Sequence, residues 1–158
     1  FIEAAQLLES KKVPAEFWLV GEPDQDSKIS IPLSTLNYHH DRGHIKYFGY
    51  QNNIKKIWQQ SHVAVLPSYR EGLSRTLLEA GAFGRALITT DAPGGREIVE
   101  HEKTGLLVKV RDAQSLACAM ELLVNDSSLR KKLGANARNH ILSKYDSKII
   151  AKKMVELY

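Results

Sequence analysis

Two glutamates stand eight positions apart in the stretch PSYREGLSRTLLEA, residues 67–80, and their types and spacing could serve one ligand. Glu71 precedes a helical pattern, whereas Glu79 lies inside that pattern among leucines and alanines, where a packed helix gains nothing from a carboxylate. A carboxylate in the helix can accept two hydrogen bonds from vicinal hydroxyls such as those of a ribose. Hydrogen bonds to charged groups contribute about 1.5–3 kcal/mol each, so Glu79 is a candidate anchor for a nucleotide.

The segment between the two glutamates can hold a phosphate or a diphosphate. Where the loop PSYREG turns back before the helix, the unpaired N–H groups of Leu73, Ser74 and their neighbours form an anion site. Gly72 allows the backbone to approach the ligand closely. Glu79 then lies about 7–8 Å further along the helix axis, and Glu71 lies on the other side of the phosphate. This arrangement suits a nucleotide that is joined through a diphosphate to a sugar.

The same two glutamates also have a purely structural interpretation. Glu71 can be a carboxylate that interacts with the helix dipole, which contributes only about 0.3–1 kcal/mol. Glu79 can face solvent and pair with Arg75, four residues before it. Spacing alone leaves both interpretations open.

Strands and helices alternate along the chain around this segment. Apolar runs bounded by turn residues predict strands within 13–21, 44–50, 63–66, 85–90 and 104–110. Helical spacing predicts helices within 1–10, 33–40, 53–61, 74–84, 94–101, 114–124, 127–141 and 147–157. This alternation predicts an α/β fold, a Rossmann-like parallel sheet with helices on both faces. The continuous apolar run VAVL, 63–66, is typical of a central strand.

The carboxyl ends of the strands are where this class of fold binds its ligands. Those ends carry Gly21, then Gly49 and Tyr50, then 67–75, and finally 91–95. Gly21 and Tyr50 therefore lie where a ligand would bind, but a glycine at such a turn is expected on geometry alone.

Local signals in the last third of the chain predict how its helices begin and pack. Asp112 is the expected N-cap of the helix within 114–124, and either Asp126 or Ser127 is the expected N-cap of the next one. The only cysteine, Cys118, lies within the first of these helices and is expected to be a small core residue. A single cysteine also excludes a disulfide framework.

Composition narrows the class of protein further. The chain has 158 residues, 43% of them hydrophobic, which is enough for one domain with a buried hydrophobic core. No apolar run approaches the roughly 18 residues of a membrane span, and no signal-peptide pattern is present, so a cytoplasmic location is expected. The chain opens inside a helical pattern without a methionine, which is typical of a piece of a longer protein.

The net charge of +4 is concentrated toward the C-terminus. A basic helical segment of this kind is compatible with a peripheral contact with the inner face of a membrane, but a solvated helix face is the simpler explanation. Aromatic residues do not interleave with these charges, so nucleic acid is not an expected partner. From residue 127 onward the chain has two acidic residues and these basic ones: Arg130, Lys131, Lys132, Arg138, Lys144, Lys148, Lys152 and Lys153.

No metal site is expected from the sequence. The six histidines have no ligand spacing with a cysteine or carboxylate partner. Asp24-Gln25-Asp26 fits an Asp-x-Asp pattern, but it lies in the polar loop EPDQDSKISIP and is not expected to bind a metal.

The stretch PSYREGLSRTLLEAGAFGRALITTDAPGGREIV resembles the donor-binding signature of retaining glycosyltransferases of family 4, which have the GT-B fold. That signature is two glutamates separated by seven residues, here Glu71-Gly72 and Glu79-Ala80. The segments VGEP, HIKYFGY, SHVAVLPSYREG and HEKTGLLV extend the similarity over nearly the whole chain. The resemblance is nearest to bacterial transferases that build lipid-linked or capsular polysaccharide.

The resemblance implies a role for each candidate residue. Glu71 would be the catalytic residue, which faces the donor hexose, positions it and stabilises charge near the reacting carbon. Glu79 would bind the ribose hydroxyls, while the backbone amides of Gly72, Leu73 and Ser74 would contact the sugar and the diphosphate.

Two further residues and the overall reaction follow from the same resemblance. Gly21 would lie at the mouth of the crevice, and Tyr50 would meet the base edge through its main chain. The implied activity is transfer of a hexosyl group from a nucleotide diphosphate sugar, expected to be UDP-linked, to a glycan or lipid-linked acceptor. Neither a cofactor nor a metal is implied.

The chain also departs from that family. An Arg and a Lys that clamp the diphosphate near the first helix are missing, and so is the N-terminal domain that binds the acceptor. Ser74 stands where many relatives have Pro or Gly. We therefore expect residues 1–158 to be one nucleotide-sugar-binding domain, truncated at its N-terminal edge, with little or no transferase activity by itself.

Two other functions remain open at the level of the sequence. One is a GT-B relative that acts as a sugar-nucleotide epimerase, and the other is a nucleotide-binding module without catalysis. A hydride-transferring Rossmann enzyme is disfavoured because no G-x-G-x-x-G follows the first predicted strand.

Overall fold

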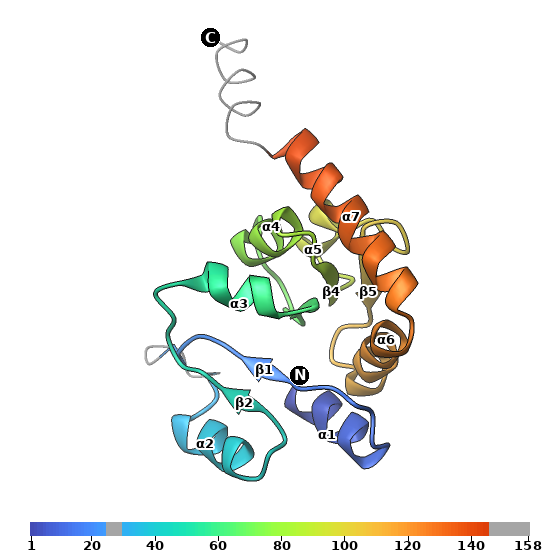
Figure 1. Cartoon of the computed structure of the whole chain (residues 1–158). Helices are drawn as coiled ribbons and strands as arrows, with labels where there is room; N and C mark the ends of the chain where they lie inside the picture. Colours follow the sequence, from blue (N-terminus) through green and yellow to red (C-terminus); the bar gives the residue numbers. More distant parts are fainter. Residues whose placement is uncertain (25–29, 146–158) are drawn as a thin grey trace.

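The computed structural model describes residues 1–24 and 30–145 of the chain. Its strands form two parallel sheets rather than one (Figure 1). The smaller sheet pairs β1 (Trp18–Leu19) with β2 (Lys46–Tyr47). The larger sheet has the order β3-β4-β5, with bounds of β3 (Val63–Leu66), β4 (Ala86–Thr90) and β5 (Gly105–Val108).

Helices connect these strands and cover both faces of the larger sheet, so the predicted α/β class with parallel strands is confirmed. Within the described residues, a helix connects each strand to the next, and two further helices follow β5. The predicted helix within 147–157 lies outside the described residues. The helices are α1 (Ile2–Ser10), α2 (Leu33–Asp41), α3 (Ile54–Gln60), α4 (Arg75–Ala82), α5 (Gly95–Ile98), α6 (Ala113–Asn125) and α7 (Ser127–Lys144).

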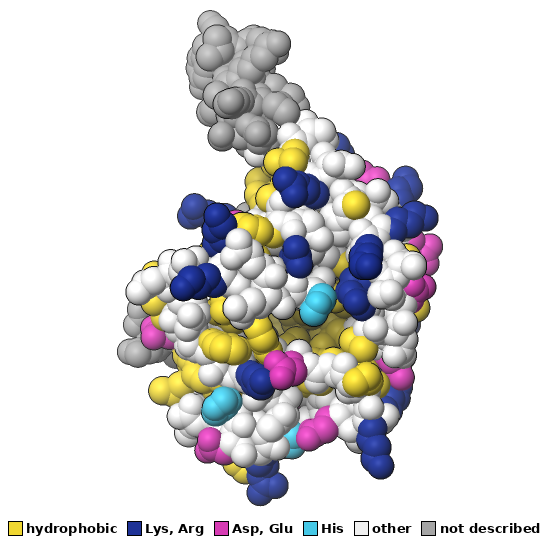
Figure 2. All heavy atoms as spheres, in the orientation of Figure 1, with side chains coloured by type: hydrophobic (Ala, Val, Ile, Leu, Met, Phe, Trp, Pro, Cys, Tyr) yellow, Lys and Arg dark blue, Asp and Glu magenta, His cyan; other side chains and the backbone are white. Residues whose placement is uncertain are grey.

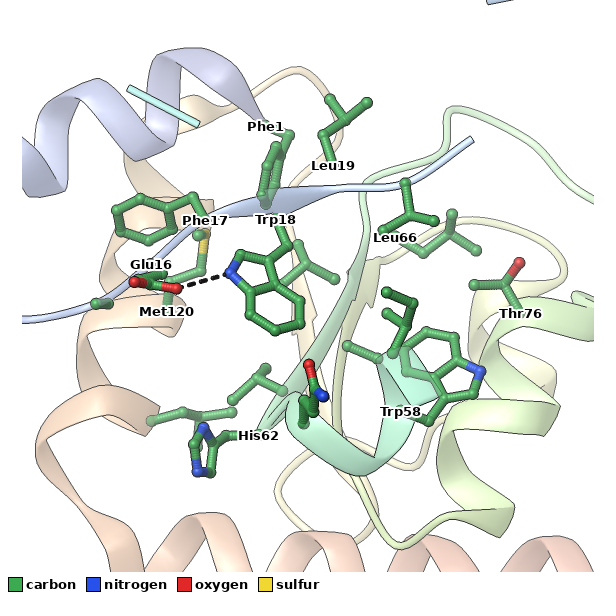
Figure 3. Close-up of a pocket in the computed structure, with 18 of the residues that line it drawn as sticks. Phe1, Glu16, Phe17, Trp18, Leu19, Trp58, His62, Leu66, Thr76 and Met120 are labelled. Atoms are coloured by element: carbon green, nitrogen blue, oxygen red, sulfur yellow. Dashed lines mark hydrogen bonds between the residues drawn. The ribbon is translucent and has the colours of Figure 1, made fainter. Parts of the chain in front are cut away.

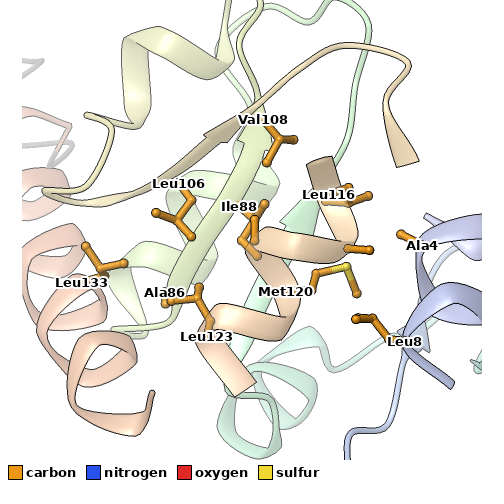
Figure 4. Close-up of a cluster of buried hydrophobic side chains, with 12 residues drawn as sticks. Ala4, Leu8, Ala86, Ile88, Leu106, Val108, Leu116, Met120, Leu123 and Leu133 are labelled. Atoms are coloured by element: carbon orange, nitrogen blue, oxygen red, sulfur yellow. The ribbon is translucent and has the colours of Figure 1, made fainter. Parts of the chain in front are cut away.

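Side chains alternate between the two faces of the larger sheet and build a separate core on each. On one face, Ile88 and Leu106 pack with α1 and α6, as Figure 4 shows for Leu8 and Met120. On the other face, Leu87 packs with buried residues of α3, α4 and α7. Because both faces are covered, each strand of this sheet must be apolar on both sides.

The central strand of the larger sheet is β4, in which all five residues are buried. The prediction that VAVL forms the central strand is therefore wrong for the sheet that the structure describes. β3 lies at the edge of that sheet, and of its residues only Ala64 is fully buried. The apolar run predicted neighbours on both sides, whereas the described residues supply β4 on one side only.

Two helix caps lie where the sequence predicts them. The backbone N–H of Ser115 donates to Asp112 Oδ1 at 2.8 Å and starts α6. Of the two candidates for the next cap, Asp126 is the residue used, since the N–H of Leu129 donates to its Oδ1 at 2.8 Å.

The expectation for Cys118 is wrong, because this residue is exposed. α6 buries Leu116, Met120 and Leu123, and position 118 lies outside that apolar stripe. Its thiol accepts a 3.5 Å contact from Gln114 Nε2 on the solvent side of the helix.

Candidate functional site

The N-terminus of α4 lies beyond the carboxyl end of β3, as the sequence predicts. Ser74 is its N-cap and is buried, with 2% of its surface exposed. Its Oγ accepts a 3.4 Å hydrogen bond from the N–H of Leu77. The cap turns the chain so that the preceding residues, Gly72 and Leu73, are exposed immediately before the first turn.

Glu71 lies on the exposed side of the loop that leads into α4. Ser68 Oγ donates to its Oε2 at 3.4 Å. The start of this loop is tied to β4, because Thr90 Oγ1 donates to the carbonyl oxygen of Ser68 and Thr89 Oγ1 donates to that of Leu66 at 2.8 Å. The carboxylate of Glu71 therefore faces solvent from a loop whose base is held by the central strand.

A second loop, between β4 and α5, packs against the segment that contains Glu71 and Gly72. Gly94 has a φ of +88°, and a Cβ placed on it would lie 2.2 Å from the carbonyl oxygen of Glu71 and 2.4 Å from that of Gly72. The backbone of Gly94 therefore packs directly against the peptide units of Glu71 and Gly72. The guanidinium of Arg111 also lies over the Tyr69 ring, 5.0 Å from its centroid, so the loop after β5 contacts the segment as well.

Glu79 points outward from α4, on the face opposite the buried Leu77, Ala80 and Gly81. Together with Thr76 it lines one end of a cavity of about 740 Å³. Within the described part of the chain, Glu79 makes no ion pair, and the predicted alternative partner Arg75 makes none either. The carboxylate is therefore free to accept hydrogen bonds from a ligand.

Gly21 and Tyr50 are brought together at the carboxyl end of the smaller sheet. The N–H of Gly21 donates to the carbonyl oxygen of Gly49 at 2.8 Å, and the φ of Gly21 is +117°. The side chain of Tyr50 is largely exposed. Neither residue lines the cavity that Glu79 borders, but Val20, next to Gly21, does.

The opposite end of this cavity has its own charged contacts (Figure 3). Glu16 accepts a hydrogen bond from Lys46 Nζ at 2.6 Å and another from Trp18 Nε1 at 3.0 Å. These two hydrogen bonds, first that from Lys46, hold the pKa of Glu16 below its ordinary value. The carboxylate of Glu16 is thus engaged by two donors, whereas Glu79 makes no ion pair within the described residues.

The predicted site residues therefore form two neighbouring groups. Glu71, Gly72, Leu73 and Ser74 are contiguous at the start of α4, and Glu79 follows one helical turn later; Gly21 and Tyr50 cluster separately on the smaller sheet. Sequence reasoning missed the residues that hold the first group in place. They share no pattern beyond their position at strand ends, and they are Ser68, Thr89, Thr90 and Gly94.

Metal binding and membrane insertion were predicted from neither motif nor hydropathy, and the described residues, 1–24 and 30–145, are relevant to both. No group of three or more His, Cys, Asp or Glu side chains is arranged to hold a metal ion there. No helix in the same residues is long and apolar enough to cross a bilayer.

A parallel α/β domain with helices on both faces belongs to the doubly wound class of folds, in which ligands bind at the carboxyl ends of the strands. The family model of glycosyl transferases group 1 matches residues 1–140. The chain belongs to this family, and its architecture is that of GT-B glycosyltransferases.

Individual relatives agree with this assignment. The chain is 35% identical over 158 residues to N,N'-diacetylbacillosaminyl-diphospho-undecaprenol alpha-1,3-N-acetylgalactosaminyltransferase of Campylobacter jejuni, covering all of this chain and 40% of that protein. It is 28% identical over 161 residues to UDP-Gal:alpha-D-GlcNAc-diphosphoundecaprenol alpha-1,3-galactosyltransferase of Escherichia coli, covering all of this chain and 41% of that one. The chain thus spans about two fifths of the length of these relatives.

A solved structure covers a similar part of such a protein. It is the C-terminal domain of a glycosyl transferase group 1 family protein from Francisella tularensis, 26% identical to this chain. The TM-score is 0.79, and the match covers 93% of this chain and 78% of that one.

Proposed function

We propose that this chain is the donor-binding domain of a retaining glycosyltransferase of family 4. The full-length enzyme would transfer a hexosyl group from a UDP-sugar to a glycan or lipid-linked acceptor. The observation that carries the proposal is the pair of exposed carboxylates, Glu71 and Glu79, on either side of the capped start of α4.

In this proposal the diphosphate of the donor lies at the N-terminus of α4. The N–H groups of Gly72, Leu73 and Ser74 lie before the first turn and can donate to phosphate oxygens, where the positive end of the helix dipole favours negative charge. As the bond to the sugar breaks, negative charge grows on the leaving diphosphate. Preorganised donors at that position stabilise such charge without reorganisation.

The two glutamates then act on the two sugars of the donor. Glu79, which is free of ion pairs within the described residues, accepts hydrogen bonds from the ribose hydroxyls. Glu71 faces the hexose, positions it and stabilises positive charge near the reacting carbon while the acceptor attacks from the same face. No cofactor or metal enters the proposal, because neutralisation of the diphosphate is assigned to backbone N–H groups.

The relatives support the class of substrate. The E. coli protein carries UDP-Gal in its name, and both named relatives act on sugars joined through a diphosphate to a polyprenol. An acceptor of that kind lies at a membrane surface, so we propose a cytoplasmic enzyme with peripheral membrane contact. The exposed basic residues of α7, which include Lys131, Lys132 and Arg138, are available for that contact.

Titration calorimetry of the protein with UDP, GDP and ADP tests the ribose anchor. Glu79→Gln keeps the shape of the side chain and removes its charge. We expect one nucleoside diphosphate to bind preferentially and its Kd to rise about tenfold or more in the variant, equivalent to about 1.4 kcal/mol. Glu102→Gln is the matched control, because Glu102 is also an exposed glutamate but lies before the amino end of β5.

Other outcomes would contradict the proposal. Equal, salt-sensitive binding of all three nucleotides, unchanged by Glu79→Gln, would mean that only a basic surface was titrated. Loss of affinity in both variants would indicate a general effect of charge rather than a contact of Glu79.

A further inference from the structure

Arg111 has a backbone conformation that residues other than glycine rarely adopt. It lies in the turn between β5 and α6 with a φ of +58°. In this left-handed region a Cβ is crowded by the backbone, so a turn that served only to connect two elements would favour glycine. Lys12 and Glu102 have the same conformation, and the strain alone therefore assigns no role. What distinguishes Arg111 from these two residues is the ring that its side chain contacts.

The guanidinium of Arg111 lies over the Tyr69 ring, with its carbon 5.0 Å from the ring centroid. This is within the distance of about 6 Å at which the face of an aromatic ring attracts a cation. Tyr69 belongs to the loop between β3 and α4, so the contact joins two loops at the carboxyl end of the larger sheet. The side chain of Tyr69 is otherwise exposed, with 59% of its surface accessible.

The backbone of Arg111 is held firmly on both sides. Before it, β5 pairs with the central strand β4 up to its last residue. After it, Asp112 caps α6 by accepting from the N–H of Ser115 at 2.8 Å. The hydroxyl of Ser115 in turn accepts from the N–H of Lys109 at 3.3 Å, which closes the turn. The backbone of Arg111 is therefore fixed relative to the larger sheet.

The loop that contains Tyr69 is held at two points by its backbone. Before Tyr69, the carbonyl oxygen of Ser68 accepts from a threonine of β4. After it, the backbone of Gly94 packs against that of Glu71. Residues 69 and 70 lie between these points, and the one side-chain interaction that the described part of the chain gives them is that of Tyr69 with Arg111. Without this contact the segment can change its path and reorient the Glu71 carboxylate.

We propose that Arg111 is a positioning residue for the transfer reaction. It holds the Tyr69 ring, and through that ring it keeps the Glu71 carboxylate directed at the donor sugar. This inference rests on the function proposed above, in which Glu71 acts on the hexose. Arg111 acts through Tyr69 and makes no contact with the donor. The segment assigned to the diphosphate, residues 72–74, is held separately by Gly94 and by the N-cap of α4, so the effect of Arg111 is confined to the chemical step.

Arg111→Gly in the full-length enzyme tests this role, because glycine removes the guanidinium and suits the left-handed backbone. In steady-state kinetics kcat should fall about tenfold or more, since a small displacement of a catalytic group carries a loss of this order. The Kd for UDP, measured by calorimetry, should change by less than about twofold, because the interaction acts on the chemical step. The midpoint of urea denaturation should not fall, because the backbone strain is relieved.

Lys12→Gly is the matched control for both charge and backbone. Lys12 is exposed, has a φ of +57° and lies between α1 and β1, away from the carboxyl ends of the strands. Lys and Arg side chains are numerous on the surface, as Figure 2 shows for one face, so the loss of a single positive charge must be controlled for. Lys12→Gly relieves the same strain and should leave kcat unchanged.

Variants of Tyr69 test whether the two side chains act together. Tyr69→Leu removes the ring face that the guanidinium contacts and should lower kcat as Arg111→Gly does. Tyr69→Phe retains that face and should lower kcat less. The double variant of Tyr69→Leu and Arg111→Gly should lose no more activity than either single variant, because residues that act as one unit are not additive. Additive losses would contradict the proposed pair.

Nitrogen-15 relaxation of the amides of residues 69–71 follows the loop without depending on activity. Their order parameters should fall in Arg111→Gly and stay unchanged in Lys12→Gly. Unchanged order in Arg111→Gly, or unchanged kcat in an active enzyme, would overturn the inference. A joint fall of kcat, UDP affinity and stability would assign Arg111 to the fold rather than to positioning. Absence of both UDP binding and transfer in the unmodified enzyme would overturn the proposed function, a result that the relaxation data separate from loss of the loop contact.

Discussion

Gly94 lies against the carbonyl oxygen of Glu71, so closely that a Cβ at position 94 would come within 2.2 Å of it. The loop after β4 thereby fixes the position of the loop that carries Glu71, the candidate catalytic residue. The contact is between two backbones, and neither can give way by rotating a side chain. A change at Gly94 must therefore move the segment from Glu71 to Gly72.

Gly94→Ala should reduce donor binding and the rate of transfer by at least about tenfold. The reason is that the new Cβ displaces Glu71 and Gly72, and a displacement of about 1 Å in a catalytic site lowers the rate by this factor or more. The positive φ also strains alanine, by about 1–2 kcal/mol. Gly43→Ala is the matched control, since Gly43 has a φ of +80° and no described atom within 4 Å of its would-be Cβ. Gly43→Ala should lose stability in urea denaturation only through its positive φ and should keep binding, whereas Gly94→Ala should lose more stability, because its Cβ also meets the backbone of Glu71 and Gly72, and should lose binding as well. Equal binding losses in the two variants would contradict the role of this contact.

Glu71→Gln should lower kcat by about 100-fold or more while UDP binds nearly as well as to the unmodified protein. The reason is that charge stabilisation near the reacting carbon acts in the transition state, whereas the nucleotide is held elsewhere. Steady-state kinetics of the full-length enzyme and calorimetry with UDP measure the two effects separately.

Ser68→Ala is the companion variant, because it removes the hydroxyl that donates to Glu71 at 3.4 Å. A long, exposed hydrogen bond is worth little, so kcat should change by no more than about fivefold. If Glu71→Gln has an equally small effect, Glu71 is not the catalytic residue.

The stability of the fold should decline as the pH falls below about 6.5, owing to His140 on α7. Burial and then the nearby Lys144 lower its pKa, although Glu100, at 3.4 Å from Nδ1, opposes them. The unfolded chain therefore binds more protons near the ordinary histidine pKa. The free energy of unfolding falls from about pH 6.5 until the pH lies below the pKa in the folded state.

Urea denaturation between pH 5 and pH 8 measures this effect. His140→Asn should flatten the pH dependence of the free energy of unfolding. His62→Asn, which replaces an exposed histidine, should leave that dependence unchanged. If the two variants have the same slope as the unmodified protein, the titrating group lies elsewhere.

Asp126→Ala should lower the free energy of unfolding by about 1 kcal/mol, because it removes the acceptor for the N–H of Leu129 at the start of α7. Ser127→Ala replaces a neighbouring residue that accepts no cap hydrogen bond in the structure, and it should change stability by less than about 0.5 kcal/mol. The same denaturation experiment compares them. A larger loss of stability for Ser127→Ala than for Asp126→Ala would identify Ser127 as the N-cap of α7.

Much of the fold was predictable because it depends on interactions between neighbours in the sequence. Helical spacing predicted α6 and its buried stripe, and Asp112 could be recognised as a cap from its position alone. The first strand was predicted within 13–21 but spans only Trp18–Leu19, and Pro14, which has no N–H to donate, lies outside it. Cys118 was misjudged because a residue in an apolar helix can still lie outside its buried stripe.

The amino-acid sequence by itself determined the alternation of strands and helices, the family signature of Glu71 and Glu79, and the start of α4 at Ser74. Each of these features depends on residues that are close together in the sequence, so it can be recognised from a single segment. Only the tertiary structure decided that Gly94 supports Glu71, that Glu79 makes no ion pair with Arg75, and that β4 rather than β3 is central in the larger sheet. Each of these depends on which segments meet in space, and a contact between distant segments leaves no periodic trace in a single sequence.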